Sequence, residues 1–157
     1  MRILGIDPGT ATTGFGLIEK TGQKLKFLDA GVISTHKDLP MGERLVILHT
    51  ELTELITEFK PDEAAVELLF FARNVTTAMT VGQAMGVIML ALAQAQIPTG
   101  EYTPMQIKQA VTSYGRAEKP QIQEMVKTLL RLDAIPKPDD AADGLAIAIT
   151  HATQTVT

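Results

Sequence analysis

The chain contains 157 residues, 45% of them hydrophobic and 20% charged, which excludes a disordered or fibrous protein and fits a single domain spanning residues 1–157. Cysteine is absent, which excludes a disulfide framework and thiolate metal ligands and permits a cytoplasmic location. The net charge of −4 argues against a uniformly basic nucleic-acid-binding protein. Residues 102–131 nevertheless hold five basic and two acidic side chains, so a local basic face is expected.

The N-terminal half shows strand patterns followed by one long helix. No signal sequence precedes residues 2–7, which are predicted to form a buried strand. Residues 14–19 and 24–35 are predicted to form two more strands, joined by a glycine-containing turn that suits an antiparallel hairpin. Apolar residues then recur at helical spacing over residues 41–59, and a fourth strand is predicted over residues 62–67.

The C-terminal half is dominated by helices. Residues 75–96 should form a largely apolar helix, which belongs either to the core or to a subunit interface where Gly82 and Gly86 let a partner backbone approach closely. Its longest uninterrupted apolar run, residues 86–93, is too short to span a bilayer. A fifth strand over residues 98–102 and three further helices complete the chain. This order predicts an α/β fold with a five-stranded mixed sheet, three strands antiparallel and two parallel, and helices on both faces.

Four carboxylates stand where a predicted strand ends or a helix begins, beside small or apolar residues. Asp7 closes the first strand and Glu67 the fourth, and these strands should be neighbours with both residues at their carboxyl ends. Asp140 and Asp143, three residues apart at a helix start, share one face. Because several buried carboxylates need a compensating cation, the sequence predicts a hard, oxygen-bound metal such as Mg²⁺ and a phosphoryl-transfer site.

Helix capping is the simpler interpretation of the last two carboxylates. Aspartate near a helix N-terminus is favoured by backbone hydrogen bonding and by the helix dipole. Capping therefore stays open for Asp140 and for Asp143 taken singly. It does not explain why four carboxylates should converge, and that convergence favours the metal site.

Five motifs follow one another along the chain and carry a family resemblance. They are Gly5-Ile6-Asp7-Pro8-Gly9-Thr10 with Thr13-Gly14-Phe15-Gly16, Glu67 followed by Phe70-Phe71-Ala72-Arg73-Asn74, Gly82-Gln83-Ala84 with Gly86, Ala117-Glu118-Lys119 with Gln121, and Asp140-Ala141-Ala142-Asp143-Gly144-Leu145-Ala146. Together they resemble, from end to end, the RuvC-type Holliday junction resolvases of bacteria. Two positions depart from the family pattern: Leu68 replaces a common Gln, and Ser113 replaces a Gly.

The resemblance implies an RNase H-like fold, a homodimer, and paired symmetric cleavage of four-way DNA junctions in recombination and DNA repair. The helix over residues 75–96 is the candidate dimer contact, with burial in the core of the monomer as the alternative. Carried over by position, it implies that Asp7, Glu67, Asp140 and Asp143 are catalytic and hold two Mg²⁺ ions, with Mn²⁺ able to substitute. One ion would activate a water and the other would stabilise the leaving 3′ oxygen. The family also implies a RuvA–RuvB branch-migration complex as a partner.

Basic and aromatic residues beside these motifs are the candidates for DNA binding. The resemblance places Lys119 near the scissile phosphate, as a further catalytic residue, and Lys108 at a second basic contact. Arg73 and Arg116 fall in predicted loops where phosphate contacts are expected, and Phe70 is the candidate to stack on an unpaired base at the junction centre. The alternative for each charge taken singly is an ordinary solvated side chain.

Three other functions fit part of the sequence. The segment Asp7-Pro8-Gly9-Thr10 followed by Gly14-Phe15-Gly16 also looks like the phosphate loop of actin-like ATPases and sugar kinases, but those proteins need two such domains and this chain has no second copy. A nuclease of the same fold acting on structured RNA is a nearer alternative. A protein that binds junctions without cutting would be expected to lack a metal ligand, and all four are present.

Overall fold

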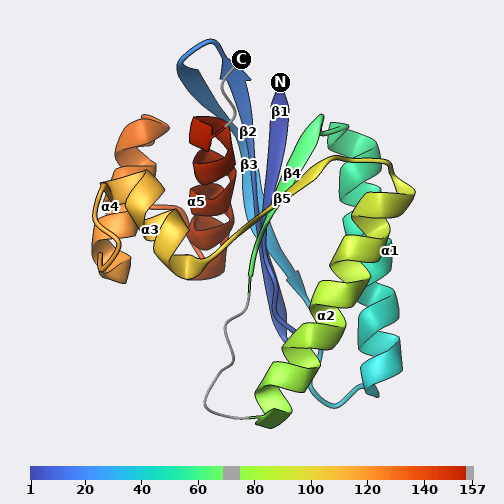
Figure 1. Cartoon of the computed structure of the whole chain (residues 1–157). Coiled ribbons are helices and arrows are strands. Elements are labelled where there is room, and N and C mark those ends of the chain that lie inside the picture. The colour runs from blue at the N-terminus through green and yellow to red at the C-terminus, as the bar shows by residue number, and fades with distance from the viewer. Residues whose placement is uncertain (69–74, 155–157) are drawn as a thin grey trace.

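A computed structural model describes residues 1–68 and 75–154, which form a sheet between two layers of helices (Figure 1). The sheet has five strands in the order β3-β2-β1-β4-β5, with α1 and α2 on one face and α3, α4 and α5 on the other. The elements are β1 (Arg2–Asp7), β2 (Thr12–Thr21), β3 (Lys24–Ser34), α1 (Met41–Phe59), β4 (Glu63–Glu67), α2 (Val75–Gln94), β5 (Thr99–Tyr102), α3 (Pro104–Thr112), α4 (Lys119–Leu129) and α5 (Asp139–Gln154). The predicted mixed sheet with helices on both faces is confirmed.

The pairing of β1 with its two neighbours fixes where the sheet places its polar residues. β1 pairs antiparallel with β2 and parallel with β4, and β4 pairs parallel with β5. Ile6 lies opposite Val66, so the next residue of each strand, Asp7 and Glu67, falls at the same edge of the sheet. On the other side of β1, Asp7 lies opposite Gly14 of β2. The expectation that the first and fourth strands are neighbours is therefore correct.

Each face of the sheet carries its own apolar core. Alternate residues of a strand point to opposite faces, so Leu4 and Ile6 pack toward α1 and α2, whereas Ile3 packs toward α5. The helix α5 is buried from Ala141 to Ala152, apart from the half-buried Asp143. A helix enclosed on all sides has its position fixed by packing along its whole length, and its N-terminus is held with it.

The helix α2 is long, apolar and unevenly covered. It spans 20 residues with a mean hydropathy of 1.6, so the whole helix meets the length and composition of a membrane span although its longest unbroken apolar run does not. One such helix is weak support for a membrane segment, and Ala84 and Ile88 of α2 pack into the core shared with α1. Met79 and Leu90, which are 65% and 52% exposed, remain outside that core.

Candidate metal and DNA-binding site

Glycines at the contact between α5 and the sheet set how closely the helix approaches. A Cβ atom added at Gly14 would overlap the backbone oxygen of Asp140, and one added at Gly144 would lie 2.6 Å from the backbone nitrogen of Gly16. Side chains at these positions would therefore push α5 off β1 and β2. The first turn of α5 reaches the end of β1 because this contact is made backbone to backbone.

The turn between β1 and β2 is tied down by threonine hydroxyls. The buried Thr13 donates a hydrogen bond to the backbone oxygen of Gly9 at 2.7 Å, and Thr35 donates one to the backbone oxygen of Thr10 at 2.6 Å. Arg44 of α1 donates in turn to the hydroxyl of Thr35 at 2.9 Å. These hydrogen bonds hold the turn that follows Asp7. The end of β1 is therefore held by this turn as well as by the packing of α5.

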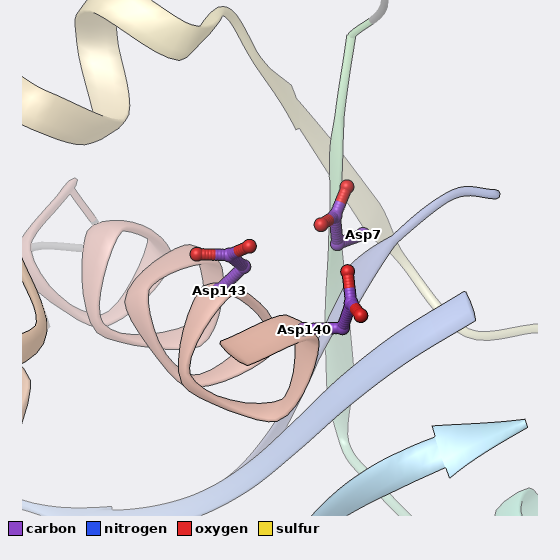
Figure 2. A group of neighbouring side chains, drawn as sticks. All are labelled: Asp7, Asp140 and Asp143. Atoms are coloured by element: carbon purple, nitrogen blue, oxygen red, sulfur yellow. The ribbon is translucent and has the colours of Figure 1, made fainter. Parts of the chain in front are cut away.

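Three of the four predicted carboxylates converge at this place (Figure 2). One oxygen each of Asp7, Asp140 and Asp143 lies within 4.8 Å of the other two, among the residues that the structure describes. Asp7 comes from the end of β1 and the other two from the start of α5. Asp140 and Asp143 lie inside α5, which begins at Asp139, so neither is its N-cap, although the helix dipole still favours Asp140 in the first turn.

Glu67 joins the group through Asp7 rather than as a member of the compact cluster. Burial, together with the charges of Glu67 and Asp143, raises the pKa of Asp7 to about 8. A hydrogen bond between the Asp7 and Glu67 side chains acts to raise the pKa of Asp7 and to lower that of Glu67. Burial also raises the pKa of Glu67, with the charges of Lys108 and Lys119 acting in the opposite direction.

The electrostatics of the group fit a divalent cation. Burial and the neighbouring carboxylate charges raise the pKa of Asp7 to about 8, so without a cation Asp7 stays protonated up to about that pH. Carboxylate oxygens without sulfur ligands suit hard cations such as Mg²⁺ and Mn²⁺. Burial likewise raises the pKa of Asp143, although the ammonium of Lys119 opposes that effect.

A cleft of about 450 Å³ opens beside the carboxylates, between α3, α4 and α5. Its lining includes three acidic side chains, Glu67, Glu118 and Asp143, and the three described basic candidates, Lys108, Arg116 and Lys119. Its remaining wall includes apolar side chains of the same helices, among them Ile107, Ile122 and Ile147. The cleft therefore combines a charge pattern suited to a phosphate backbone with an apolar surface suited to sugars and bases.

Two candidate site residues lie outside the part of the chain that the structure describes, and two contacts at the site were not predicted from the sequence. Phe70 and Arg73 lie outside the described residues. The close contact of Gly14 with α5 was not anticipated, because a glycine in a strand signals close approach without saying to what. Asp139 was not anticipated either, although its carboxylate lies 3.9 Å from the Lys119 ammonium.

Comparison with known proteins agrees with this picture. The family model of the crossover junction endodeoxyribonuclease RuvC matches residues 3–151. The RuvC of Brevibacillus brevis is 59% identical over 152 residues, covering 97% of this chain and 92% of that relative. The structure of Thermus thermophilus RuvC matches with a TM-score of 0.89 at 39% identity. The T. thermophilus RuvC in complex with a Holliday junction substrate matches with a TM-score of 0.92 at 38% identity. Both matches cover 97% of this chain and 93% of the other, and they confirm the RNase H-like fold.

Proposed function

Because the chain belongs to the RuvC family of crossover junction endodeoxyribonucleases, we propose that it resolves four-way DNA junctions by hydrolysing phosphodiester bonds in recombination and DNA repair. The observation that carries this function is the convergence of Asp7, Asp140 and Asp143, the last of which also lines a cleft that holds Lys108, Arg116 and Lys119. The carboxylates suit a metal-dependent hydrolysis, and the basic side chains of the cleft suit the strand to be cut.

Asp7, Glu67, Asp140 and Asp143 would hold the metal, and we assign it as Mg²⁺, two ions to a site, with Mn²⁺ able to substitute. Two divalent cations balance the four negative charges of the ligands, which supports this number. When bound, such cations activate a water and neutralise the charge that develops on the phosphate and on the leaving 3′ oxygen.

The remaining residues of the cleft bind and orient the strand. Lys119 is the first residue of α4, and its ammonium lies 3.2 Å from a carboxylate oxygen of Asp143. Lys108 on α3 acts electrostatically on Glu67 from the same cleft. Both amines and the guanidinium of Arg116 would contact phosphates on either side of the bond to be cut. Phe70 and Arg73 stay predictions for the junction centre.

A homodimer through α2 would give two such sites related by a two-fold axis, as symmetric cutting of a four-way junction requires. The exposed apolar face of α2 supports this arrangement, since Met79 is 65% exposed and both Gly82 and Gly86 have open space beside them. Met79→Glu should convert the dimer to a monomer in multi-angle light scattering. Val46→Glu, at an equally exposed valine of α1 (64%), is the matched control and should leave the mass unchanged. Coupling to a RuvA–RuvB complex stays a prediction from family membership.

The test of the function is cleavage of a synthetic mobile four-way junction in Mg²⁺, comparing wild type with Asp7→Asn. Wild type should introduce paired symmetric nicks, and the variant should bind the junction without cutting it. Asp38→Asn, a change at an exposed carboxylate outside the proposed ligand set, is the control and should cut like wild type. Binding without cleavage by wild type in both Mg²⁺ and Mn²⁺ would favour a binding protein. Cleavage of structured RNA in place of junction DNA would favour the RNA nuclease.

A further inference from the structure

The ammonium of Lys119 lies between two carboxylates that belong to different parts of the site. Its Nζ is 3.2 Å from Oδ2 of Asp143 and 3.9 Å from Oδ2 of Asp139. The second oxygen of Asp139, Oδ1, is 3.5 Å from Nζ of Lys137. Asp143 is one of the carboxylates that converge on Asp7, whereas Asp139 is not. Lys119 therefore bridges Asp143, a proposed metal ligand, and Asp139, which is not a proposed ligand.

Both ends of this bridge are held by their helices. Lys119 is the first residue of α4, behind a reciprocal capping arrangement in which the backbone nitrogen of Glu118 donates to the Gln121 side chain at 2.8 Å. Asp139 is the first residue of α5, whose position is fixed by burial. The side chain of Lys119 itself is about half exposed, so its ammonium can move between partners while the backbones stay in place.

We propose that Asp139 is a positioning residue, which keeps Lys119 at the edge of the cleft once a divalent cation has displaced the ammonium from Asp143. The inference rests on the proposed function, because it assigns Asp143 to the metal. An ammonium at 3.2 Å occupies a carboxylate oxygen that the cation needs, so the two positive groups compete for it. Asp139, steadied by Lys137 on its other oxygen, then retains the ammonium within reach of a DNA phosphate.

The competition can be measured without DNA and without catalysis. Mn²⁺ binding to the full-length protein, followed by the electron paramagnetic resonance of free Mn²⁺, reports the affinity directly. Lys119→Met should bind Mn²⁺ about tenfold more tightly than wild type, because a repelling charge is removed from a half-exposed site. Lys127→Met removes one charge from the same helix, where Lys127 pairs with Glu124, and should change the affinity less than about twofold. Equal Mn²⁺ affinities for Lys119→Met and Lys127→Met would refute the proposal that the Lys119 ammonium competes with the cation for Asp143.

The positioning role is tested by a double-mutant cycle on single-turnover junction cleavage. Asp139→Asn should slow cleavage about fivefold in the wild-type background and less than about twofold in the Lys119→Met background. Asp139→Glu keeps the carboxylate and should restore most of the rate. An Asp139→Asn effect of equal size in both backgrounds would show that Asp139 does not act through Lys119, and would overturn the proposal.

The two kinds of failure are distinguishable. A wild-type protein that binds no Mn²⁺ would refute the metal site of the proposed function, and the positioning role of Asp139 would fall with it. A wild-type protein that binds Mn²⁺ and cuts junctions, but whose affinity is unaffected by Lys119→Met, would refute only the exchange of cations at Asp143.

Discussion

Asp7→Asn is expected to make the metal-free protein more stable while removing its activity. Burial and the charges of Glu67 and Asp143 raise the pKa of Asp7 from 3.8 to about 8 in the folded protein. A folded-state pKa above the unfolded value means that the folded protein binds the extra proton, so stability falls as the pH rises between these two values. Asparagine has nearly the same shape as aspartic acid but does not ionise, so the fall in stability that comes from ionising Asp7 is absent in the variant.

The size of the effect follows from the same interval. At about 1.4 kcal/mol per pH unit, the range from 3.8 to about 8 sets a ceiling of about 6 kcal/mol for the stability lost through Asp7. Asp7 and Glu67 titrate as a coupled pair, so part of this loss of stability arises from Glu67 and remains in the Asp7→Asn variant. We therefore expect Asp7→Asn to be about 2–4 kcal/mol more stable at pH 7.5 in a chelating buffer. The gap should shrink to below about 1 kcal/mol at pH 4.5.

Urea unfolding followed by far-ultraviolet circular dichroism is the appropriate measurement, because the chain contains no tryptophan. Asp38→Asn, at an exposed carboxylate, is the control and should stay within about 0.5 kcal/mol of wild type at both pH values. Saturating Mg²⁺ should reverse the order, since only wild type gains full binding energy from the cation. An Asp7→Asn protein that is no more stable than wild type at pH 7.5, or whose advantage persists unchanged at pH 4.5, would refute the reasoning.

Three further predictions concern the scaffold, and thermal or urea unfolding checks each of them. Gly144→Ala should cost more than about 3 kcal/mol, because its Cβ would overlap the backbone of β2; a variant as stable as wild type would show that α5 can move off the sheet. Ser113→Gly should add about 1 kcal/mol, because Ser113 ends α3 in the left-handed conformation (φ 61°) that glycine adopts without strain, and no gain would indicate a side-chain contact that offsets it. His151→Ala should lower the free energy of unfolding by about 2–4 kcal/mol, because the imidazole ring is hydrogen-bonded to Tyr102 at 2.8 Å and to Glu63 at 2.6 Å. An unchanged stability would mean that water replaces the ring as a hydrogen-bond partner.

Much of the fold could be predicted from the sequence because its elements carry strong local patterns. The N-cap of α3 is an example: Thr103 and Gln106 form the reciprocal capping bonds that their spacing suggests. The parallel pairing of β1 with β4 followed from the order of strands and helices, and it brought Asp7 and Glu67 to one edge. The family resemblance was needed for the identity of the substrate, which no periodicity conveys.

The rest depends on distances that sequence spacing does not contain. The sequence does not show that Gly14 of β2 is the place where the backbone of α5 meets the sheet. It does not show the pairing of Asp139 with Lys119 either, because these two residues lie twenty positions apart. Ser113 departed from the family pattern, yet it takes the left-handed conformation that explains a glycine there.

The four proposed metal ligands repel one another, and the burial of α5 keeps them close together despite this repulsion. A helix buried from Ala141 to Ala152 is anchored far beyond its charged first turn, so repulsion at Asp140 and Asp143 cannot detach it from β1. It follows that two groups of substitutions should separate in a joint assay of stability and cleavage. Neutral substitutions at Asp7, Glu67 or Asp143, whose pKa values are raised in the folded protein, should raise the stability of the metal-free protein and abolish cleavage. Changes at Gly14 or Gly144 should lower both. A carboxylate variant that lost stability in chelating buffer would mean that its side chain supports the fold directly rather than through a bound cation.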